Sequence, residues 1–208
     1  MIVRNRVGRI EPMGALAKTL TTDFPGGVVP SWLTVVGIDA ESTTPPGGVR
    51  LDGVALSLAG AAIDLTAVAG VKLTASYTGG SPSGTLFKFG VYSNAGGGAG
   101  GGALLSSVSA TPNFRLRAYN TGGGITEKDP AYEQGSNAKR YHVTVWIDPT
   151  DRSIAFGEGP DQVAGAWRFT GSQFPLGTFV PKLEWLDNGA DQSIGRDIHQ
   201  MSITTYWL

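Results

Sequence analysis

Polar and aromatic side chains that could bind a ligand alternate with apolar residues along several stretches of this sequence. Sugars are bound by aromatic rings that cover their apolar C–H faces and by a few polar groups that fix the hydroxyls. Because successive side chains of a strand point to opposite faces, residues of one parity would share the face opposite the core. The candidate carbohydrate-binding residues chosen in this way are Arg115, Arg117, Tyr119, His142, Trp146 and Glu184.

Trp146 is the residue on which this hypothesis depends most. Three interpretations stay open for its indole: it stacks on a glycan, it contacts a neighbouring subunit, or it packs into a second apolar layer. An exposed large aromatic side chain marks a contact without identifying the partner. The sequence alone does not choose among the three.

The acidic residues do not have the spacing that glycoside hydrolysis needs. Two carboxyl groups must lie about 5–5.5 Å apart for retention or about 6.5–9.5 Å apart for inversion. Glu184 and Asp187 have opposite parity, so a regular strand turns them to different faces. The sequence also lacks a Gly-x-Ser-x-Gly nucleophile motif. We therefore expect a protein that is not an enzyme. The alternative is a glycoside hydrolase or lyase with carboxylates from separate strands, such as Asp148 and Glu184.

A metal site has one candidate segment, the sequence Asp-Asn-Gly-Ala-Asp at 187–191. Asp187 and Asp191 offer the hard oxygen ligands that Ca²⁺ accepts. The same residue types also form turns for purely backbone reasons. The chain has no cysteine, which excludes a thiolate-bound metal. We expect no cofactor. If the chain does bind Ca²⁺, Asp187 and Asp191 are the residues that would hold it.

The charge of the chain argues against strongly charged partners. The formal net charge is −1 at pH 7 and only 16% of the residues are charged. So weak a field does not attract nucleic acid or an anionic membrane. No window approaches 18 consecutive apolar residues, and the basic N-terminus is not followed by the apolar stretch of a signal peptide. We expect no nucleic-acid partner and no membrane insertion.

From Val28 onward the apolar residues recur with a period of two, for example at 71–78, 114–119 and 141–148. This alternation indicates strands with one buried and one exposed face. Clusters rich in Gly and Pro, such as 45–48, separate these runs and indicate turns. Crossover helices, which parallel sheets need, are not indicated. The sequence therefore predicts an all-β fold with two packed antiparallel sheets.

We divide the chain into an N-terminal arm, 1–22, and one β-sandwich domain, 23–208. A single all-β domain often reaches about 200–250 residues, which fits the length of the chain. Helical spacing fits only in the arm and at 63–68. The arm is either a frayed terminus or an assembly segment that orders on a neighbouring subunit.

Several segments resemble the concanavalin A-like lectin/glucanase family. They are 24–32 with its tryptophan, 48–51 (Gly-Val-Arg-Leu), the hairpin formed by 141–148 and 152–156, and the closing run 198–207. The resemblance covers roughly residues 20–208 and implies a two-sheet antiparallel jelly-roll sandwich with an extended N-terminal arm. It also implies a concave outer face used for carbohydrate. The Glu-x-Asp-x-Glu run of the family's glucanases is not present here.

The richness in Ala, Gly and Thr, the lack of cysteine and the short arm resemble minor tail and other virion-surface proteins of phages that infect actinobacteria. This resemblance implies a non-enzymatic virion structural protein, assembled in the host cytoplasm. Its partners would be other virion proteins, copies of itself and host cell-surface glycans. We expect a homo-oligomer and favour a trimer, which suits a tail appendage. A cellular carbohydrate-binding lectin domain is the further alternative.

Overall fold

The computed structural model describes most of the 208-residue chain. The described residues are 2–4, 10–12, 16–43, 46–78, 85–93, 100–108, 111–129, 140–159, 165–187 and 196–208. Within them the regular structure is β-strand, apart from one 3₁₀ turn, η1 (Pro25–Gly27).

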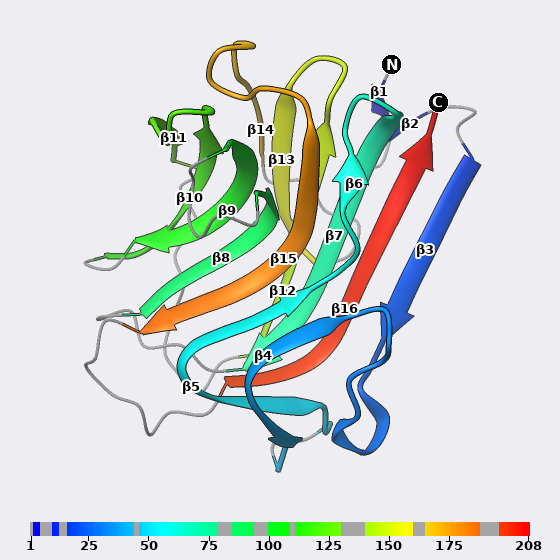
Figure 1. Ribbon diagram of the computed structural model, residues 1–208, viewed down its shortest axis with the longest axis vertical. Helices are drawn as coiled ribbons and strands as arrows, with labels where there is room; N and C mark the ends of the chain where they lie inside the picture. Colours follow the sequence, from blue (N-terminus) through cyan, green and yellow to red (C-terminus); the bar gives the residue numbers. More distant parts are fainter. Residues whose placement is uncertain are drawn as a thin grey trace.

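The strands form two antiparallel layers that pack face to face (Figure 1). The back layer has the order β3 (Leu16–Thr22), β16 (Arg196–Trp207), β7 (Val68–Thr78), β12 (Arg140–Asp148), β13 (Ser153–Glu158) and β14 (Gly165–Arg168). The curved layer has the order β4 (Thr34–Glu41), β5 (Val49–Ala59), β15 (Thr178–Asp187), β8 (Thr85–Tyr92), β9 (Gly102–Val108), β10 (Thr111–Tyr119) and β11 (Ile125–Lys128). The predicted two-sheet antiparallel sandwich is therefore confirmed.

One strand joins the two layers. Strand β16 pairs with β7 along residues 197–207, and it also pairs with 49–51 of β5 through residues 196–198 and with β3 through residues 201–207. The backbone hydrogen bonds therefore run without a break from one layer to the other. The inward-facing side chains of both layers form one core. The remaining short strands are β1 (Ile2–Arg4), which pairs with β2 (Ile10–Pro12), and β6 (Ile63–Asp64), which pairs with β15.

Aromatic rings bridge the layers in the centre of the core. The Tyr77 ring of β7 stacks on Phe87 of β8 with centroids 4.9 Å apart and on Tyr141 of β12 at 5.3 Å. Phe114 of β10 meets Phe87 edge-on at 5.9 Å and Phe156 of β13 at 6.0 Å. Each such pair adds about 0.5–1.5 kcal/mol beyond the burial of its area. These contacts fix which residues of each strand face inward.

The segment assigned to the arm includes a strand of the sandwich. Residues 16–22 form β3, which pairs with β16 from Leu16 opposite Trp207 to Thr22 opposite Met201. The sandwich therefore begins at Leu16 rather than at residue 23. Helical spacing was misleading here and at 63–68, which is β6 followed by a turn. In segments this short, the apolar residues fit both the helical period of 3.6 and the strand period of two, and pairing with a distant strand decides between them.

No described helix has the length and apolarity needed to cross a membrane.

Candidate functional site

The structure divides the six predicted binding residues between opposite sides of the sandwich. Arg115, Arg117 and Tyr119 lie on β10 and Glu184 lies on β15, so these four belong to the curved layer. His142 and Trp146 belong to β12 of the back layer. The odd-numbered residues of β12 enter the core, so its even-numbered residues point outward on the other side. The single six-residue face expected from the sequence is therefore not formed.

Trp146 does not provide an open aromatic surface. Its side chain is only 4% exposed, and the Nζ atom of Lys72 lies 5.7 Å from the centroid of its ring. Lys72 is its register partner on β7, so the lysine lies against the indole across neighbouring strands. Of the three interpretations left open by the sequence, packing within this chain is the one that the structure favours.

His142 is half-buried on the same outer face. Burial lowers the pKa of its imidazole, and the nearby charge of Arg140 lowers it further. The ring is therefore neutral at pH 7. His142 lies four residues before Trp146 on β12, in the layer opposite the curved-layer residues with which it was grouped.

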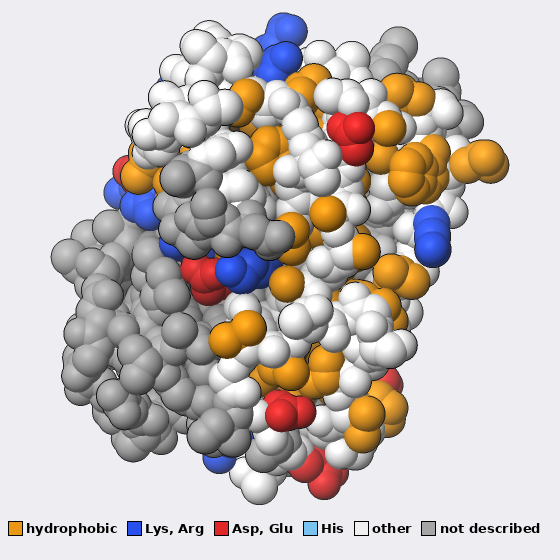
Figure 2. All heavy atoms as spheres, viewed as in Figure 1, with side chains coloured by type: hydrophobic (Ala, Val, Ile, Leu, Met, Phe, Trp, Pro, Cys, Tyr) orange, Lys and Arg blue, Asp and Glu red, His pale blue; other side chains and the backbone are white. Residues whose placement is uncertain are grey.

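The outer face of the curved layer carries ion pairs between strands. Glu184 binds two lysines: its Oε1 lies 3.6 Å from Nζ of Lys88, and its Oε2 pairs with Nζ of Lys182. Further along the layer, Arg117 Nη2 lies 2.6 Å from Glu127 Oε1. These residues and one more pair, Arg115 with Asp129 at 2.6 Å, form what we call the charged row: Lys88, Arg115, Arg117, Glu127, Asp129, Lys182 and Glu184. Figure 2 shows acidic and basic side chains in contact over β8 and β15.

The middle of the charged row is buried. Lys88 is 3% exposed and Glu184 is 5% exposed. Burial lowers the pKa of Lys88, although the Glu184 carboxylate raises it in part. Burial also raises the pKa of Tyr92 well above its usual range, and Glu184 adds to this effect. Each of these charges therefore has an oppositely charged partner within the face.

Tyr119 is also unavailable as a stacking surface. It is 2% exposed and packs with Tyr92 and Leu104 in a small apolar cluster beside the charged row. The Nζ atom of Lys182 lies 5.1 Å from the centroid of the Tyr92 ring and covers it. The predicted residues Arg115, Arg117, Tyr119 and Glu184 thus share a face, but their rings and charges already have partners within the chain.

The separate-strand carboxylate pair does not form. Asp148 ends β12 in the back layer, whereas Glu184 lies on the outer face of the curved layer. Asp148 Oδ1 accepts a hydrogen bond from the Thr150 N–H at 2.8 Å. Burial raises the pKa of Asp148, and the charge of Asp151 contributes to the increase. An acid and a base on opposite sides of a core cannot act on one glycosidic bond.

The described residues contain no group of three or more His, Cys, Asp and Glu side chains that could hold a metal ion. Asp187 ends β15, and its side chain is outside the described set. Asp191 lies outside the described residues altogether. The expectation of no cofactor, with Asp187 and Asp191 as the calcium ligands in the opposite case, therefore stays a prediction from the sequence.

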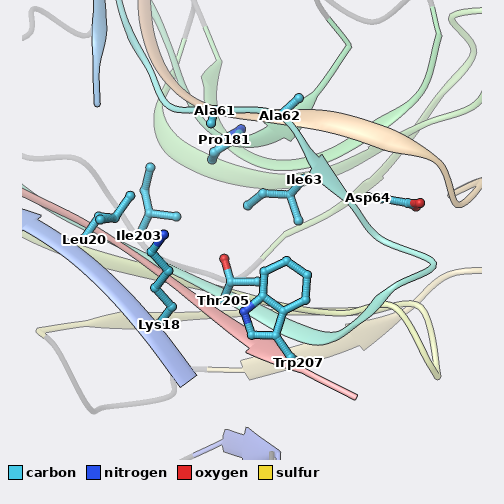
Figure 3. Close-up of a pocket in the computed structure, with 10 residues that line it drawn as sticks. All are labelled: Lys18, Leu20, Ala61, Ala62, Ile63, Asp64, Pro181, Ile203, Thr205 and Trp207. Carbon is cyan, nitrogen blue, oxygen red and sulfur yellow. The ribbon is translucent and has the colours of Figure 1, made fainter. Parts of the chain in front are cut away.

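An open pocket of about 200 Å³ lies at one edge of the sandwich, between the two layers (Figure 3). Leu20 pairs with Ile203 and Lys18 with Thr205, and this register turns all four toward the inside of the back layer. This edge pocket is lined by Lys18, Leu20, Ala61, Ala62, Ile63, Asp64, Pro181, Ile203, Thr205 and Trp207.

The edge pocket combines an exposed aromatic ring with polar groups. Trp207 is 43% exposed, and Figure 3 shows its indole beside Thr205 and opposite Ile63, with Lys18 at the side. Asp64 lies at the rim and its carboxylate points away. Hydrogen bonds to Asp64 Oδ1 from the Thr66 hydroxyl at 2.7 Å and the Thr66 N–H at 2.9 Å lower its pKa.

The edge pocket was not predicted from the sequence because its residues come from four distant segments. The available signal was Trp207 at the last position of an alternating run. A strand that extends past the opposite layer leaves a large side chain at its end partly exposed. Figure 2 shows hydrophobic side chains at this end of β3 and β16. The exposed ones there are Leu16, Trp207 and Leu208.

No protein-family model matches this sequence, and no curated protein matches it either. Solved structures do share the fold. Winged bean acidic lectin, complexed with methyl-α-D-galactose, is 12% identical over 93% of this chain and 100% of its own, with a TM-score of 0.62. Bacillus licheniformis β-glucanase is 11% identical over 95% and 100%, with a TM-score of 0.56. The CBM2 module of the evolved Dit protein of Lactobacillus casei BL23 phage J-1 is 9% identical over 92% and 98%, with a TM-score of 0.55. The chain therefore has the concanavalin A-like jelly-roll fold of lectins and glucanases.

Proposed function

We propose that this chain is a non-catalytic carbohydrate-binding protein of a bacteriophage virion, and that the edge pocket holds the sugar. The observation that carries the proposal is Trp207, a partly exposed indole beside an open pocket that also presents Thr205 and Lys18. An indole covers the apolar face of a pyranose, while the hydroxyl and the ammonium group hydrogen-bond its oxygens. Lectins and a glucanase with the same fold support carbohydrate as the ligand class.

The size of the edge pocket supports a small ligand. Its volume of about 200 Å³ is below the roughly 300–1,000 Å³ typical of sites for drug-sized molecules. A single terminal sugar therefore fits better than a longer oligosaccharide. One ring and a few hydrogen bonds give weak binding, so many copies on one particle would be needed for useful avidity.

The charged row supports a non-catalytic role. Both carboxylate oxygens of Glu184 are engaged by lysines, and Glu127 and Asp129 pair with arginines. A glycosidase needs one carboxyl group that can donate a proton and a second that faces it across the substrate. A hydrolase is therefore the less favoured candidate.

The virion part of the proposal adds copies of the chain and other virion proteins as partners. It is supported by the phage J-1 module that shares this fold and by the avidity argument. Exposed apolar residues on and next to an edge strand of the curved layer, Val28 and Val36, offer surface for such contacts. A homo-oligomer, and a trimer in particular, is what we expect for a tail appendage. A free-standing cellular lectin domain is the alternative.

A glycan array tests the sugar proposal. Wild-type protein is compared with Trp207→Ala and with Ile125→Ala, which removes an exposed apolar side chain from β11, far from the pocket. We expect Trp207→Ala to lose about tenfold or more of the signal, since a stacking contact contributes roughly 1–3 kcal/mol. Ile125→Ala should keep the wild-type pattern. Equal signals from wild type and Trp207→Ala overturn the edge pocket as the site.

The assembly proposal has a separate test. Light scattering coupled to size-exclusion chromatography should give three times the 21.7 kDa mass of the chain. A monomer at every accessible concentration favours a lone lectin domain and contradicts the proposed assembly role.

A further inference from the structure

A second pocket, of about 380 Å³, lies where the turn between β12 and β13 meets the loop that follows β14. This turn pocket is on the far side of the back layer from β3, so it is separate from the edge pocket. It is lined by Thr150, Asp151, Arg152, Arg168, Phe169, Thr170 and Gly171.

The turn holds Arg152 in an unusual backbone conformation. Two aspartates fix the turn: Asp148 Oδ1 accepts from the Thr150 N–H at 2.8 Å, and Asp151 Oδ1 accepts from the Ser153 N–H at 2.9 Å. Arg152 then has a φ of 58°, a left-handed conformation that favours glycine or asparagine. An arginine there carries backbone strain that a glycine would not. Glycine would avoid this strain, so the contribution of an arginine at this position is its guanidinium group.

Part of that role is structural. Arg152 Nη1 donates to the carbonyl oxygen of Phe174 at 2.5 Å, and the Phe169 N–H donates to the Arg152 carbonyl at 3.0 Å. The guanidinium lies against Gly171, where an added Cβ would be 3.5 Å from Arg152 Nε. These contacts hold the loop 169–174 on the turn and fix the guanidinium at the wall of the turn pocket.

Arg168 completes the basic lining from the next strand. It is the register partner of Ser153, and its Nε donates to the Asp151 carbonyl at 2.9 Å. That bond fixes the side chain and leaves its two terminal nitrogens free of described partners. Two guanidinium groups, one from the turn before β13 and one from β14, are therefore held at one pocket by bonds to carbonyl oxygens.

Neither Arg152 nor Arg168 forms an ion pair with a described carboxylate. Three arginines elsewhere in the fold differ, since Arg50, Arg115 and Arg117 pair with Asp197, Asp129 and Glu127 respectively. Asp151 is the acidic residue of the lining, and its Oδ1 already accepts the Ser153 N–H. Among the described residues, the turn pocket thus has two arginines against one aspartate and planar donors without a partner.

We infer that the turn pocket binds an oxyanion group of a ligand between Arg152 and Arg168. Guanidinium groups present paired N–H donors that match carboxylate, sulfate and phosphate oxygens. The Thr150 hydroxyl lies in the same lining as a further donor. The inference is independent of the sugar site at Trp207, because the two pockets share no residue.

Isothermal titration calorimetry at low salt tests the turn pocket with inorganic sulfate, inorganic phosphate and glucuronate. We expect saturable millimolar binding of at least one anion. Arg168→Gln should weaken it about tenfold or more, the cost of losing one charge-assisted hydrogen bond. Arg140→Gln removes one exposed positive charge at the opposite end of β12 and is the matched control. It should change the affinity less than about twofold, because a charge separated from the turn pocket by the length of β12 interacts only weakly with it through water.

Comparison of the three anions also identifies the kind of ligand that carries the oxyanion group. Tighter glucuronate binding identifies an acidic sugar, and tighter sulfate or phosphate binding identifies an ester. Two results overturn the inference: no anion binds saturably, or Arg140→Gln weakens binding as much as Arg168→Gln. A thermal unfolding curve of Arg168→Gln that matches wild type excludes loss of the fold as the reason for weaker binding.

Discussion

Lys88 and Glu184 form a 3.6 Å ion pair across β8 and β15, and both side chains are almost fully buried although they point away from the core. Taking a charge out of water is costly unless a partner compensates it. Glu184 compensates two lysines at once, because Lys182 pairs with its second carboxylate oxygen. The carboxylate is therefore the central charge of the row.

Glu184→Gln should destabilise the fold strongly. It leaves the buried Lys88 without its counter-charge, and breaking such a pair costs about 3–5 kcal/mol. Urea unfolding followed by circular dichroism measures the loss. Glu127→Gln is the control, since Glu127 is 40% exposed and an exposed pair contributes about 0–1 kcal/mol. Similar losses for both variants would show that the Lys88–Glu184 pair carries no special stability.

His142 should make the fold less stable in mild acid. Its pKa is lowered in the folded state from its ordinary value of 6.5, by burial first and by Arg140 second. Below that pH the unfolded chain takes up a proton that the folded chain does not, so stability decreases as pH falls through the region below 6.5. His142→Gln should flatten this part of the curve of unfolding free energy against pH. An unchanged slope contradicts the expectation.

Gly90→Ala should disrupt the curved layer. A Cβ at Gly90 would lie 2.3 Å from the Ala103 carbonyl oxygen and 2.4 Å from Leu104 Cβ. Strand β9 must therefore shift, and overpacking of this kind costs about 1–3 kcal/mol. Gly122→Ala is the comparison, because its nearest neighbour, Asn120 Oδ1, would be 3.5 Å away. The difference in melting temperature between the two variants checks the close approach of β8 and β9.

Thr205→Val should weaken sugar binding without changing the fold. Thr205 lines the edge pocket, and loss of one hydrogen bond to a ligand costs about 0.5–1.5 kcal/mol, or about 2- to 12-fold in affinity. Thr204→Val is the matched control: Thr204 is adjacent on β16 but points to the outer face, where its hydroxyl bonds to Thr19. Titration with the best sugar from the array measures both. A larger loss in Thr204→Val than in Thr205→Val would place the ligand elsewhere.

The prediction of two antiparallel sheets succeeded because alternation is a local property. Tyr141, Val143 and Val145 alternate with polar residues, and the backbone of a strand turns these two sets to opposite faces whatever the strand pairs with. Residues 16–22 were misassigned because their state depends on β16, which lies at the other end of the chain. The candidate site was predicted less well because it too depends on pairings between segments that are distant in the sequence.

The sequence by itself determined the alternating strands from Val28 onward, the side of each that enters the core and the lack of an enzyme motif, since each follows from residue types at short spacing. Only the tertiary structure decided that Trp146 and Glu184 lie on opposite outer faces. It also decided that Trp207 borders an open pocket and that Arg152 and Arg168 meet at one turn. The physical reason is that strand order is set by pairings between distant segments, and alternation carries no information on which strands become neighbours.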